Sequence, residues 1–401
     1  MDAHPSLPYQ GLRVVEFTHM VMGPTCGLVL ADLGAEVIKV EPPSGDNTRR
    51  LLGSGAGFYP LFNRNKKSLV LDLHTPEGRE AVLRLIDTAD VVSENFKAGT
   101  LRKLGLDYET LRQRNPRLIY VSHKGFLPGP YDHRTALDEV VQMMGGLAYM
   151  TGRPGDPLRA GSSVNDIMGG LFGAIGVMAA LAQREQTGQG QLVQSALFEN
   201  NVFLVAQHMM QYAVTGKPAA PMPARISAWG IYDVFSVLHG EQIFLAVVSD
   251  TQWAIFCRAF GFADLQTDDR LRTNNDRVRE RAWLIPLLRE RLQTRSRADL
   301  AAVFEREGLP FAPITAPHEL LHDPHLQATG GLATITLPDG EQAGQPAATA
   351  LLPLSLGGER LGVRHSPPRL GQHSLDLLQE LGYDLDSASR LSRPTPSPPS
   401  T

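Results

Sequence analysis

Asn165 and Asp166 stand directly before a long apolar run, and this pair is the most reactive pattern in the sequence. The 17 residues from 167 to 183 carry no charge, which predicts a helix with Asp166 at its N-terminal end. Aspartate is a preferred helix cap and is favoured by the helix dipole. A desolvated carboxylate beside an acyl group is also a competent covalent nucleophile. The spacing alone leaves both roles open.

Other catalytic patterns are incomplete. The first predicted strand is followed by THMVMGP, which lacks the glycines of a dinucleotide-binding turn. The glycine-rich run 53–57 lacks the Lys-Ser/Thr of a phosphate loop, and 161–165 lacks the last glycine of a nucleophile elbow. His322 and His325 have metal-like spacing, but Pro324 interrupts any helix that would align them. Two cysteines cannot build a four-thiolate zinc site. We therefore expect no metal site.

The composition is that of a globular protein. Of 401 residues, 42% are hydrophobic and 20% are charged, which excludes wholesale disorder. The formal net charge of −4 argues against a broad basic surface that would bind nucleic acid. The first ten residues lack the pattern of a secretory signal. The run 167–183 is short for a membrane span and contains four glycines, so we expect a buried helix in a cytoplasmic protein without membrane or nucleic-acid partners.

Strand-like and helix-like runs alternate in the first half of the chain. One helix has a well-formed start, with Thr75 as N-cap, Pro76 in the first position and Glu77 in the first turn. Continuous apolar strands that alternate with helices are typical of a parallel sheet covered on both faces. We therefore expect an α/β fold with an open parallel sheet, with strands at 12–17, 37–41, 68–73, 90–96 and 117–122.

The pattern changes after about residue 200. A helix-like run at 203–216 leads into a proline-rich crossing, and 229–237 with 242–248 reads as a β-hairpin. Helical patterns fill most of 251–308. The final residues are proline-rich and lack apolar periodicity. We therefore expect a large domain with its first part at 1–200, a linker at 201–225, a small domain at 226–330, a return to the large domain at 331–391 and a disordered tail at 392–401.

Segments along the whole chain resemble the family III CoA-transferases, the group that includes formyl-CoA transferase and carnitine CoA-transferase. The resemblance covers about residues 11–390. It rests on many ordered pieces, among them GLRVVEFTHMVMGP (11–24), LADLGAEVIKVEPPSGDNTR (30–49), FNRNKKSLVLDLHTPEGRE (62–80), DVVSENFKAGTLRKLGL (90–106), LDEVVQMMGG (137–146), NDIMGGLFGAIGVMAAL (165–181) and PPRLGQHSLDLLQELGY (367–383). It implies a Rossmann-like large domain, a smaller α/β domain and a homodimer of interlocked rings whose active site lies between two subunits.

The resemblance implies that Asp166 is the nucleophile. Asp166 would attack the thioester of an acyl-CoA to form an acyl-aspartyl anhydride, and the CoA thiolate would return to give an aspartyl-CoA thioester. An acceptor carboxylate would then take over the aspartyl acyl bond and release the thiolate, and the thiolate would attack again to yield the new acyl-CoA. CoA is thus a substrate, and no permanently bound cofactor is expected. The helix dipole is expected to keep Asp166 ionised at neutral pH.

Four further positions match CoA-binding segments of the family. Asn95 and Phe96 match a segment whose backbone lies against CoA. Lys103 stands where formyl-CoA transferase has an arginine near the nucleotide, and lysine keeps the charge but loses bidentate contact with phosphate. Lys124 lies in a matching stretch, where the alternative is an ion pair at a strand end.

Departures from the family pattern concern the acceptor. Formyl-CoA transferase has a glutamine near its oxalate site, and Val21 stands there instead. RAGSSVND and SAWGIYDVF resemble members that act on dicarboxylates of four or five carbons, such as succinyl-CoA with mesaconate, itaconate or citramalate. We therefore expect succinyl-CoA as donor and a small dicarboxylic acid as acceptor. The distal carboxylate of this acid needs a cation or a hydroxyl as its partner, and the candidates are Arg159, Arg225 and Tyr232. The alternative for each arginine is an exposed position at which it only keeps the protein soluble.

Alternative functions within this fold are a formyl-CoA:oxalate-type transferase and an α-methylacyl-CoA racemase. The racemase branch uses a histidine directly before an aspartate, and the corresponding pair is Leu137-Asp138. The first base is therefore missing, although racemisation needs a base on each face of the substrate. A binding module without chemistry is the third alternative, and an intact nucleophile at Asp166 argues against it.

Overall fold

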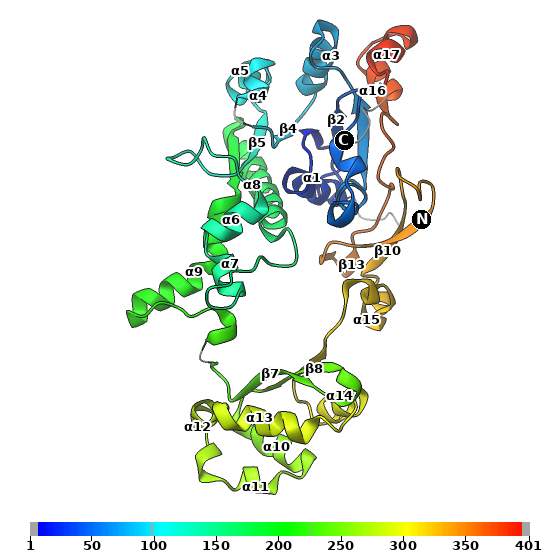
Figure 1. The fold of residues 1–401 in the computed structure, drawn as a ribbon. Coiled ribbons are helices and arrows are strands. Elements are labelled where there is room, and N and C mark those ends of the chain that lie inside the picture. The colour runs from blue at the N-terminus through cyan, green and yellow to red at the C-terminus, as the bar shows by residue number, and fades with distance from the viewer. Residues whose placement is uncertain (1–6, 98, 226, 395–401) are drawn as a thin grey trace. The chain divides into compact units, whose positions relative to one another are not determined.

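The computed structural model describes residues 7–394 except 98 and 226, and the chain divides into two units (Figure 1). Unit 1 comprises residues 1–221 and 324–401, and unit 2 comprises 222–323. Helix α9 (Leu197–Thr215) occupies the first half of the range expected as a linker and ends where Gly216 takes a φ of 68°. From residue 395 on, the tail expected to be disordered lies outside the described residues.

Unit 1 is built on a six-stranded parallel sheet, which confirms the expected α/β fold. The strand order is β3-β2-β1-β4-β5-β6, so the order reverses between β1 and β4. In open α/β sheets ligands bind beyond the carboxyl ends of the strands at such a point. The strands are β1 (Arg13–Phe17), β2 (Glu36–Glu41), β3 (Lys66–Val70), β4 (Val91–Glu94), β5 (Ile119–Lys124) and β6 (Leu192–Ala196).

Alternate strand residues face opposite sides of the sheet, because side chains have a period of two along a strand. Val14 and Val37 pack toward α1 and α8, whereas Val15 and Ile38 pack toward the helices of the other face. The expected start of α3 is confirmed, since the Thr75 hydroxyl accepts the Gly78 N–H at 3.0 Å. The covering helices are α1 (Met22–Asp32) and α8 (Val164–Thr187) on one face, and α3 (Pro76–Asp87), α4 (Thr100–Lys103), α5 (Tyr108–Arg114), α16 (Ser374–Glu380) and α17 (Leu385–Leu391) on the other.

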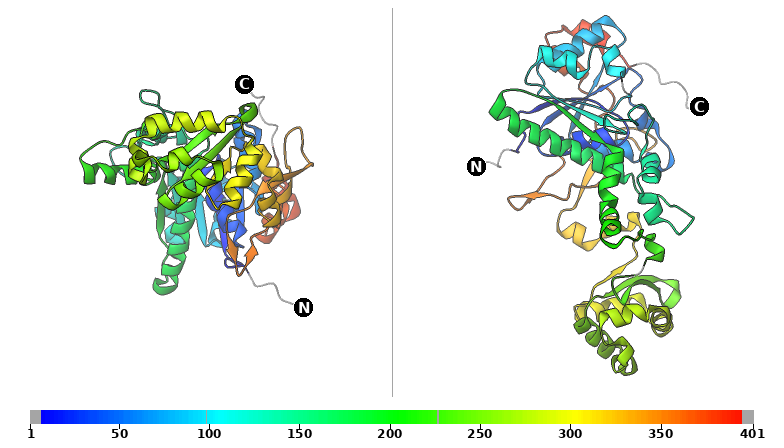
Figure 2. Two further views of the ribbon diagram at one scale, coloured as in Figure 1. Left: turned by 90° about the horizontal axis from the view of Figure 1, so that it is seen from below. Right: turned by 90° about the vertical axis from the view of Figure 1, so that its left-hand side faces the viewer.

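Helix α8 packs against α1 and against strands β5 and β6 (Figure 2). Glycine allows this close approach, because a Cβ at Gly170 would lie 2.4 Å from the carbonyl oxygen of Met22. By length and composition α8 is also apolar enough to cross a membrane, but a core helix passes the same test. It is buried along one side only, and Phe172 and Ile175 on its other side are exposed.

Short elements surround these layers in unit 1. Residues 364–374 cover the edge strand β3, where the Asn65 N–H donates to the His365 carbonyl at 2.9 Å and the His373 N–H donates to the Ser68 carbonyl at 3.1 Å. This cover leaves less of the edge open to other chains. The remaining elements are α2 (Phe58–Phe62), α6 (Asp138–Met144), α7 (Leu147–Thr151), α15 (Pro324–Ala328), the hairpin β10 (Leu332–Thr336) and β11 (Pro346–Ala350), and the short pair β12 (Ser355–Leu356) and β13 (Glu359–Arg360).

Unit 2 has its own sheet and core. The expected hairpin is present, with Ile231 opposite Val247, and a third antiparallel strand completes the sheet. Aromatic side chains of the helices, including Trp253, Phe256 and Phe304, form the core with the sheet. The elements are β7 (Ile231–Ser236), β8 (Gln242–Val247), β9 (Phe311–Pro313), α10 (Asp250–Phe260), α11 (Ala263–Gln266), α12 (Asn274–Arg279), α13 (Arg281–Leu292) and α14 (Arg297–Arg306).

Candidate active site

Asp166 lies in the first turn of α8 and is half-buried. The helix is capped by another carboxylate: Asp138, at the start of α6, accepts the N–H groups of Asn165 at 2.7 Å and of Asp166 at 3.1 Å through Oδ2. Two donors that a helix start leaves without a partner are thereby satisfied. Because Asp138 does the capping, the Asp166 carboxylate is not needed for that role.

The position of Asp138 is itself fixed by buried contacts. The Gln142 side-chain amide donates to Asp138 Oδ1, and its oxygen accepts the Ala160 N–H at 2.8 Å. Gln142 has no exposed surface and Asp138 is 6% exposed. Gln142 therefore ties α6, the start of α8 and the loop between them into one network. Such support holds a reactive side chain in place better than a free loop would.

Burial raises the pKa of the Asp166 carboxyl to about 7, and the negative charge of Asp138 acts in the same direction. The expectation that the helix dipole keeps this group ionised at neutral pH is therefore wrong. The dipole effect is small at a helix start, and desolvation with a like charge outweighs it. Near pH 7 both protonation states are populated, and the nucleophilic carboxylate dominates only above that pH.

Asn95 and Phe96 lie at the point where the strand order reverses, beyond the end of β4. The Asn95 side chain clamps the turn after β1, accepting the His19 N–H at 3.0 Å and donating to the His19 carbonyl at 2.8 Å. The rings of His19 and Phe96 are 5.5 Å apart. Asn95 thus joins the two strand ends that flank the expected ligand crevice.

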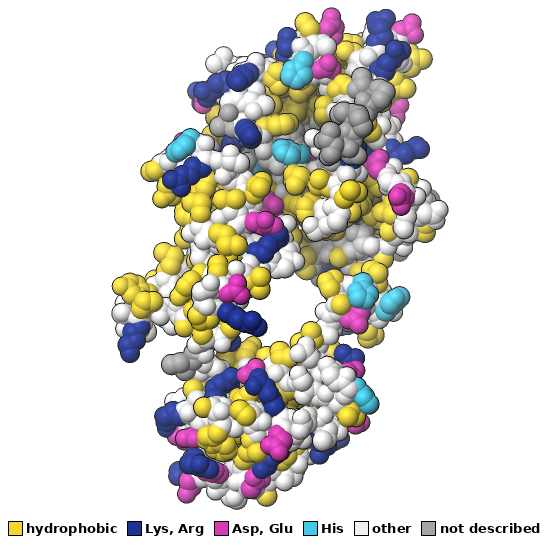
Figure 3. Space-filling model, viewed as in Figure 1, with side chains coloured by type: hydrophobic (Ala, Val, Ile, Leu, Met, Phe, Trp, Pro, Cys, Tyr) yellow, Lys and Arg dark blue, Asp and Glu magenta, His cyan; other side chains and the backbone are white. Residues whose placement is uncertain are grey.

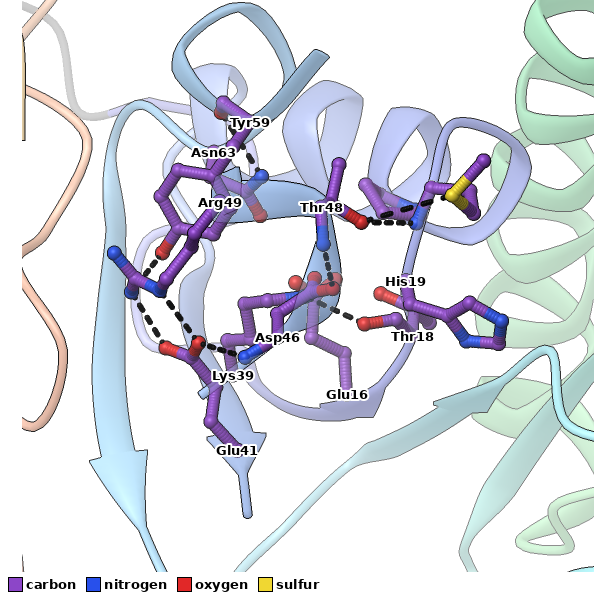
Figure 4. A network of polar contacts seen from close by, with 12 residues as sticks. Glu16, Thr18, His19, Lys39, Glu41, Asp46, Thr48, Arg49, Tyr59 and Asn63 are labelled. Carbon is purple, nitrogen blue, oxygen red and sulfur yellow. Dashed lines mark hydrogen bonds and ion pairs between the residues drawn. The ribbon is translucent and has the colours of Figure 1, made fainter. Parts of the chain in front are cut away.

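The turn that carries His19 is held from beneath by a buried network (Figure 4). Lys39 is fully buried, donates to the Thr18 carbonyl at 2.5 Å and pairs with Asp46 at 3.0 Å. Asp46 in turn accepts the Thr48 N–H at 2.8 Å, and the Thr48 hydroxyl accepts the Met20 N–H at 2.9 Å. Met20 adopts a φ of 63°, which this network supports.

Lys124 forms an ion pair, one of the two roles considered for it. Its ammonium contacts Glu94 at 2.8 Å and donates to the Phe96 carbonyl at 3.1 Å. Glu94 is 4% exposed and also accepts the Phe96 N–H at 2.9 Å. Lys124 therefore fixes the segment that contains Asn95 and Phe96. Lys124 therefore supports the expected ligand crevice indirectly, by holding that segment in place.

Lys103 ends α4 and is exposed. Two further exposed cations, Lys97 and Arg102, lie close to it in the chain. Within the described residues none of the three forms an ion pair with a carboxylate. Sequence reasoning selected Lys103 alone, although the run FKAGTLRK carries all three charges. Exposed cations near a ligand crevice favour a phosphate-bearing ligand.

Val21 and Leu137 supply no polar group. Val21 is 1% exposed and packs with Leu28 and Ile167, the residue that follows Asp166. Leu137 precedes α6 and is 62% exposed, and Asp138 beside it carries the capping contacts described above. Neither side chain can hold an oxalate through hydrogen bonds or act as a base.

The three candidates for the distal carboxylate fall in different units. Arg159 lies in unit 1, is paired with Glu139 and precedes Ala160, whose N–H contacts Gln142. Arg225 and Tyr232 lie together in unit 2, where they line a cavity of about 340 Å³ with Met222, Pro223, Ser227, Asp233 and Arg281. The structure thus brings Arg225 and Tyr232 together. Arg281 adds a second guanidinium to this cavity, and the sequence analysis missed it.

Asp233 neutralises one of the two arginines of this cavity. It contacts Arg281 at 3.0 Å and Arg289 at 3.3 Å. The Arg225 guanidinium donates to the Met222 carbonyl at 2.8 Å and, among the described residues, faces no carboxylate within ion-pair distance. The Trp229 ring lies tilted against the Tyr232 ring, with centroids 4.7 Å apart. Tyr232 therefore gives the cavity one aromatic side chain, and Arg225 gives it a net positive charge.

Comparison with known proteins gives the family. Residues 9–374 match the sequence model of CoA-transferase family III. A succinate–glutarate CoA-transferase of Agrobacterium fabrum is 35% identical over 387 residues, covering 93% of this chain and 96% of the relative. A succinyl-CoA:mesaconate CoA-transferase of Haloarcula hispanica is 34% identical, covering 92% and 96%.

Solved structures agree. A CaiB/BaiF family protein from Brucella suis has a TM-score of 0.84 at 37% identity, covering 94% of this chain and 100% of that protein. The chain belongs to CoA-transferase family III. It is a transferase whose substrates are CoA thioesters, which confirms the family and the kind of enzyme expected from the sequence.

Proposed function

We propose that this protein moves CoA from succinyl-CoA to a small dicarboxylic acid by covalent chemistry on Asp166. The observation that carries the proposal is the free carboxyl of Asp166 on the first turn of α8, with Asp138 in the capping role. A carboxylate whose oxygens are not used for capping keeps its lone pairs for attack on a thioester. The relatives with succinyl-CoA, glutarate and mesaconate in their names support this choice of substrates.

The reaction balances without a metal or a nucleotide. An Asp166 oxygen attacks the succinyl carbonyl, the C–S bond breaks, CoA leaves as a thiolate, and a succinyl-aspartyl anhydride remains. The thiolate attacks the aspartyl carbonyl of the anhydride, which releases succinate and leaves an aspartyl-CoA thioester. The acceptor carboxylate attacks that thioester to form a new anhydride and expel the thiolate. Thiolate attack on the acceptor carbonyl then gives the new acyl-CoA and restores Asp166.

The chain's own residues bind and orient CoA in this scheme. We place the pantetheine arm against the backbone of Asn95 and Phe96, where the side chain of Asn95 and the ion pair of Lys124 hold the segment rigid. Lys103, with Lys97 and Arg102, would attract the phosphates of the nucleotide end. A rigid crevice lowers the entropy cost of bringing thioester and carboxylate together.

For the acceptor we assign the cavity of unit 2. A dicarboxylate that reacts at one end keeps a charge at the other, which must be paired when water is excluded. Arg225 is a cation without a carboxylate partner in the described chain, and Tyr232 adds a hydroxyl. Guanidinium and carboxylate match as a bidentate pair. Arg225 and Tyr232 would thus select a second carboxylate over a methyl group.

This assignment predicts a loss of selectivity in Arg225→Gln. With succinyl-CoA as donor and product read by mass spectrometry, the variant should show a KM for glutarate and mesaconate raised about tenfold or more, because one charged hydrogen bond is lost. The KM for succinyl-CoA should rise less, because the CoA moiety supplies most of the binding contacts of that substrate and the variant leaves them unchanged. Arg258→Gln, an exposed arginine of α10, is the matched control. If wild-type protein used butyrate as well as glutarate, the dicarboxylate proposal would be wrong.

We also propose an interlocked homodimer in the cytoplasm, with Asp166 from one subunit and the acceptor cavity from the other. Exposed apolar side chains on α8 and α9 support a partner surface, among them Phe172, Ile175, Phe203, Met209 and Met210. Hydrophobic side chains gather around the projecting end of α9 in Figure 3. Co-expressing Asp166→Asn and Arg225→Gln chains tests the arrangement. A heterodimer with shared sites has one fully intact site and should show the wild-type KM for glutarate. Heterodimers that show only the raised KM of Arg225→Gln would show that each site belongs to one subunit.

A further inference from the structure

A second cavity, of about 600 Å³, lies in unit 1 at the edge strand β3. The segment 364–373 forms one wall, and the end of β10 with the turn before β11 forms the other. None of the residues given a catalytic or CoA-binding role above lines this cavity. The proposed transferase function does not use it.

The wall from 364 to 373 presents hydrogen-bond donors. Arg364 and Arg369 contribute guanidinium groups, and His365 and His373 contribute imidazoles. The Nδ1 atom of His373 accepts the Ser68 N–H at 3.2 Å, so the ring proton must be on Nε2, which is left as a donor. The Ser366 oxygen accepts the Thr336 N–H at 2.9 Å, so its hydroxyl hydrogen is free to donate.

Among the described residues, the arginines of this wall form no ion pair with a carboxylate. Arg364 donates to the carbonyls of Ala31 and Asp32 at the end of α1, and the Arg369 side chain makes no ion pair within the described chain. The two acidic residues of the turn between β10 and β11 are committed elsewhere or exposed. Asp339 pairs with Arg49 at 2.6 Å, and Glu341 lies exposed on the turn between β10 and β11.

Burial and neighbouring charges shift the pKa values of two groups of this wall. Burial lowers the pKa of His373, and the neighbouring Lys67 and His365 side chains lower it further against an opposing effect of Asp376. Burial also lowers the pKa of Arg364, and the charge of Asp32 only partly offsets this. A cavity lined by two guanidiniums, imidazole and hydroxyl donors is matched by an anion with two charges and several acceptor oxygens.

We propose that this cavity is a binding site for a phosphate-bearing anion, held by Arg369, Arg364, His373 and Ser366. A phosphate group carries close to two negative charges and three strong acceptor oxygens near neutral pH, whereas a carboxylate carries one charge. Arginine binds phosphate in a bidentate manner. An anion here would join the β10–β11 hairpin to the segment that covers β3. It would therefore stabilise unit 1 in proportion to its occupancy.

Calorimetric titration with inorganic pyrophosphate tests the proposal, with CoA present at saturation so that the CoA site is filled. Wild-type protein should bind one pyrophosphate per chain with an accompanying rise in Tm. Arg369→Gln should bind about tenfold more weakly, because it loses a charged hydrogen bond, and Arg369→Glu should not bind. Arg117→Gln, an exposed arginine at the other edge of the sheet, is the matched control and should bind like wild type.

ADP and glutarate serve as the comparison ligands. ADP that binds more tightly than pyrophosphate assigns the site to a nucleotide, and weaker binding of ADP assigns it to a compact phosphate compound. Three results would overturn the proposal: no pyrophosphate binding under saturating CoA, equal affinity in Arg369→Gln and wild type, or glutarate binding as tightly as pyrophosphate. Arg369 is exposed, and its side chain makes no hydrogen bond or ion pair in the described chain, so the variant tests binding without disturbing the fold.

Discussion

Replacing Asp166 by asparagine is expected to lower kcat for CoA transfer by at least about 10⁴-fold, because the amide oxygen cannot form the anhydride or the thioester. The fold should remain, since Asp138 and not residue 166 caps helix α8. Steady-state kinetics with succinyl-CoA and glutarate measure the first effect, and near-ultraviolet circular dichroism checks the second. Near-normal turnover by the variant would show that another group is the nucleophile.

The same variant should be more stable than wild type at pH 8. The Asp166 pKa is about 7 in the folded chain and 3.8 in its ordinary state, so the unfolded chain loses this proton first as pH rises. Ionisation therefore costs folding stability between about pH 4 and pH 7, and this cost persists above pH 7. Asparagine removes it. Tm should rise by several degrees at pH 8 and change little at pH 4, and a lower Tm at pH 8 would contradict the buried-carboxyl account.

The second large effect is expected for Asp138→Asn, which keeps the shape but removes the charge beside Asp166. Gln142 presents its amide to Asp138 and its oxygen to Ala160, so an asparagine amide at 138 leaves two donors facing each other. The start of α8 should shift, and a misplaced nucleophile can lower kcat by about 100-fold.

The charge removed at residue 138 should also move the pH profile. The pKa of Asp166 falls, since the like charge that raises it is gone, while its burial remains. The acidic limb of the kcat/KM profile, which reports the free enzyme, should lie near pH 7 in wild type and at lower pH in the variant. Asp87→Asn, on the exposed end of α3, is the control and should leave the profile unchanged. An acidic limb that stays in place would exclude coupling between the two carboxyls.

The sheet of unit 1 could be predicted from the sequence, because its strands are continuous apolar runs between well-marked helices. Strand β6 was missed, since Leu192–Ala196 is a short edge strand whose first residues are partly exposed. Helix α8 was predicted at nearly its full length from its lack of charge. Its exposed side was not foreseen, because composition does not tell which apolar faces find a neighbour within the chain.

The support of the candidate site could not be predicted. Asp138 and Asp166 are separated by 28 positions and meet only through the fold, so no local spacing marks Asp138 as a cap. The pKa of Asp166 depends on the same tertiary contact and on burial. The grouping of Arg225 with Tyr232 and Arg281 in unit 2 likewise arises from the hairpin and the start of α13. Similarity to family motifs identified single positions, whereas the contacts between these positions arise only when the chain is folded.

The proposed mechanism requires a covalent intermediate at Asp166. Mass spectrometry of the protein during turnover tests most directly for this intermediate. Wild-type protein incubated with succinyl-CoA alone should gain the mass of CoA as a thioester. Borohydride should reduce this thioester, release CoA and convert the aspartate side chain to an alcohol. After proteolysis, the resulting mass change should map to the peptide that contains Asp166. Hydroxylamine should inactivate the enzyme only when acyl-CoA is present. An adduct on Asp138 or another carboxylate, or exchange of CoA between acids with no adduct at all, would contradict the proposed mechanism.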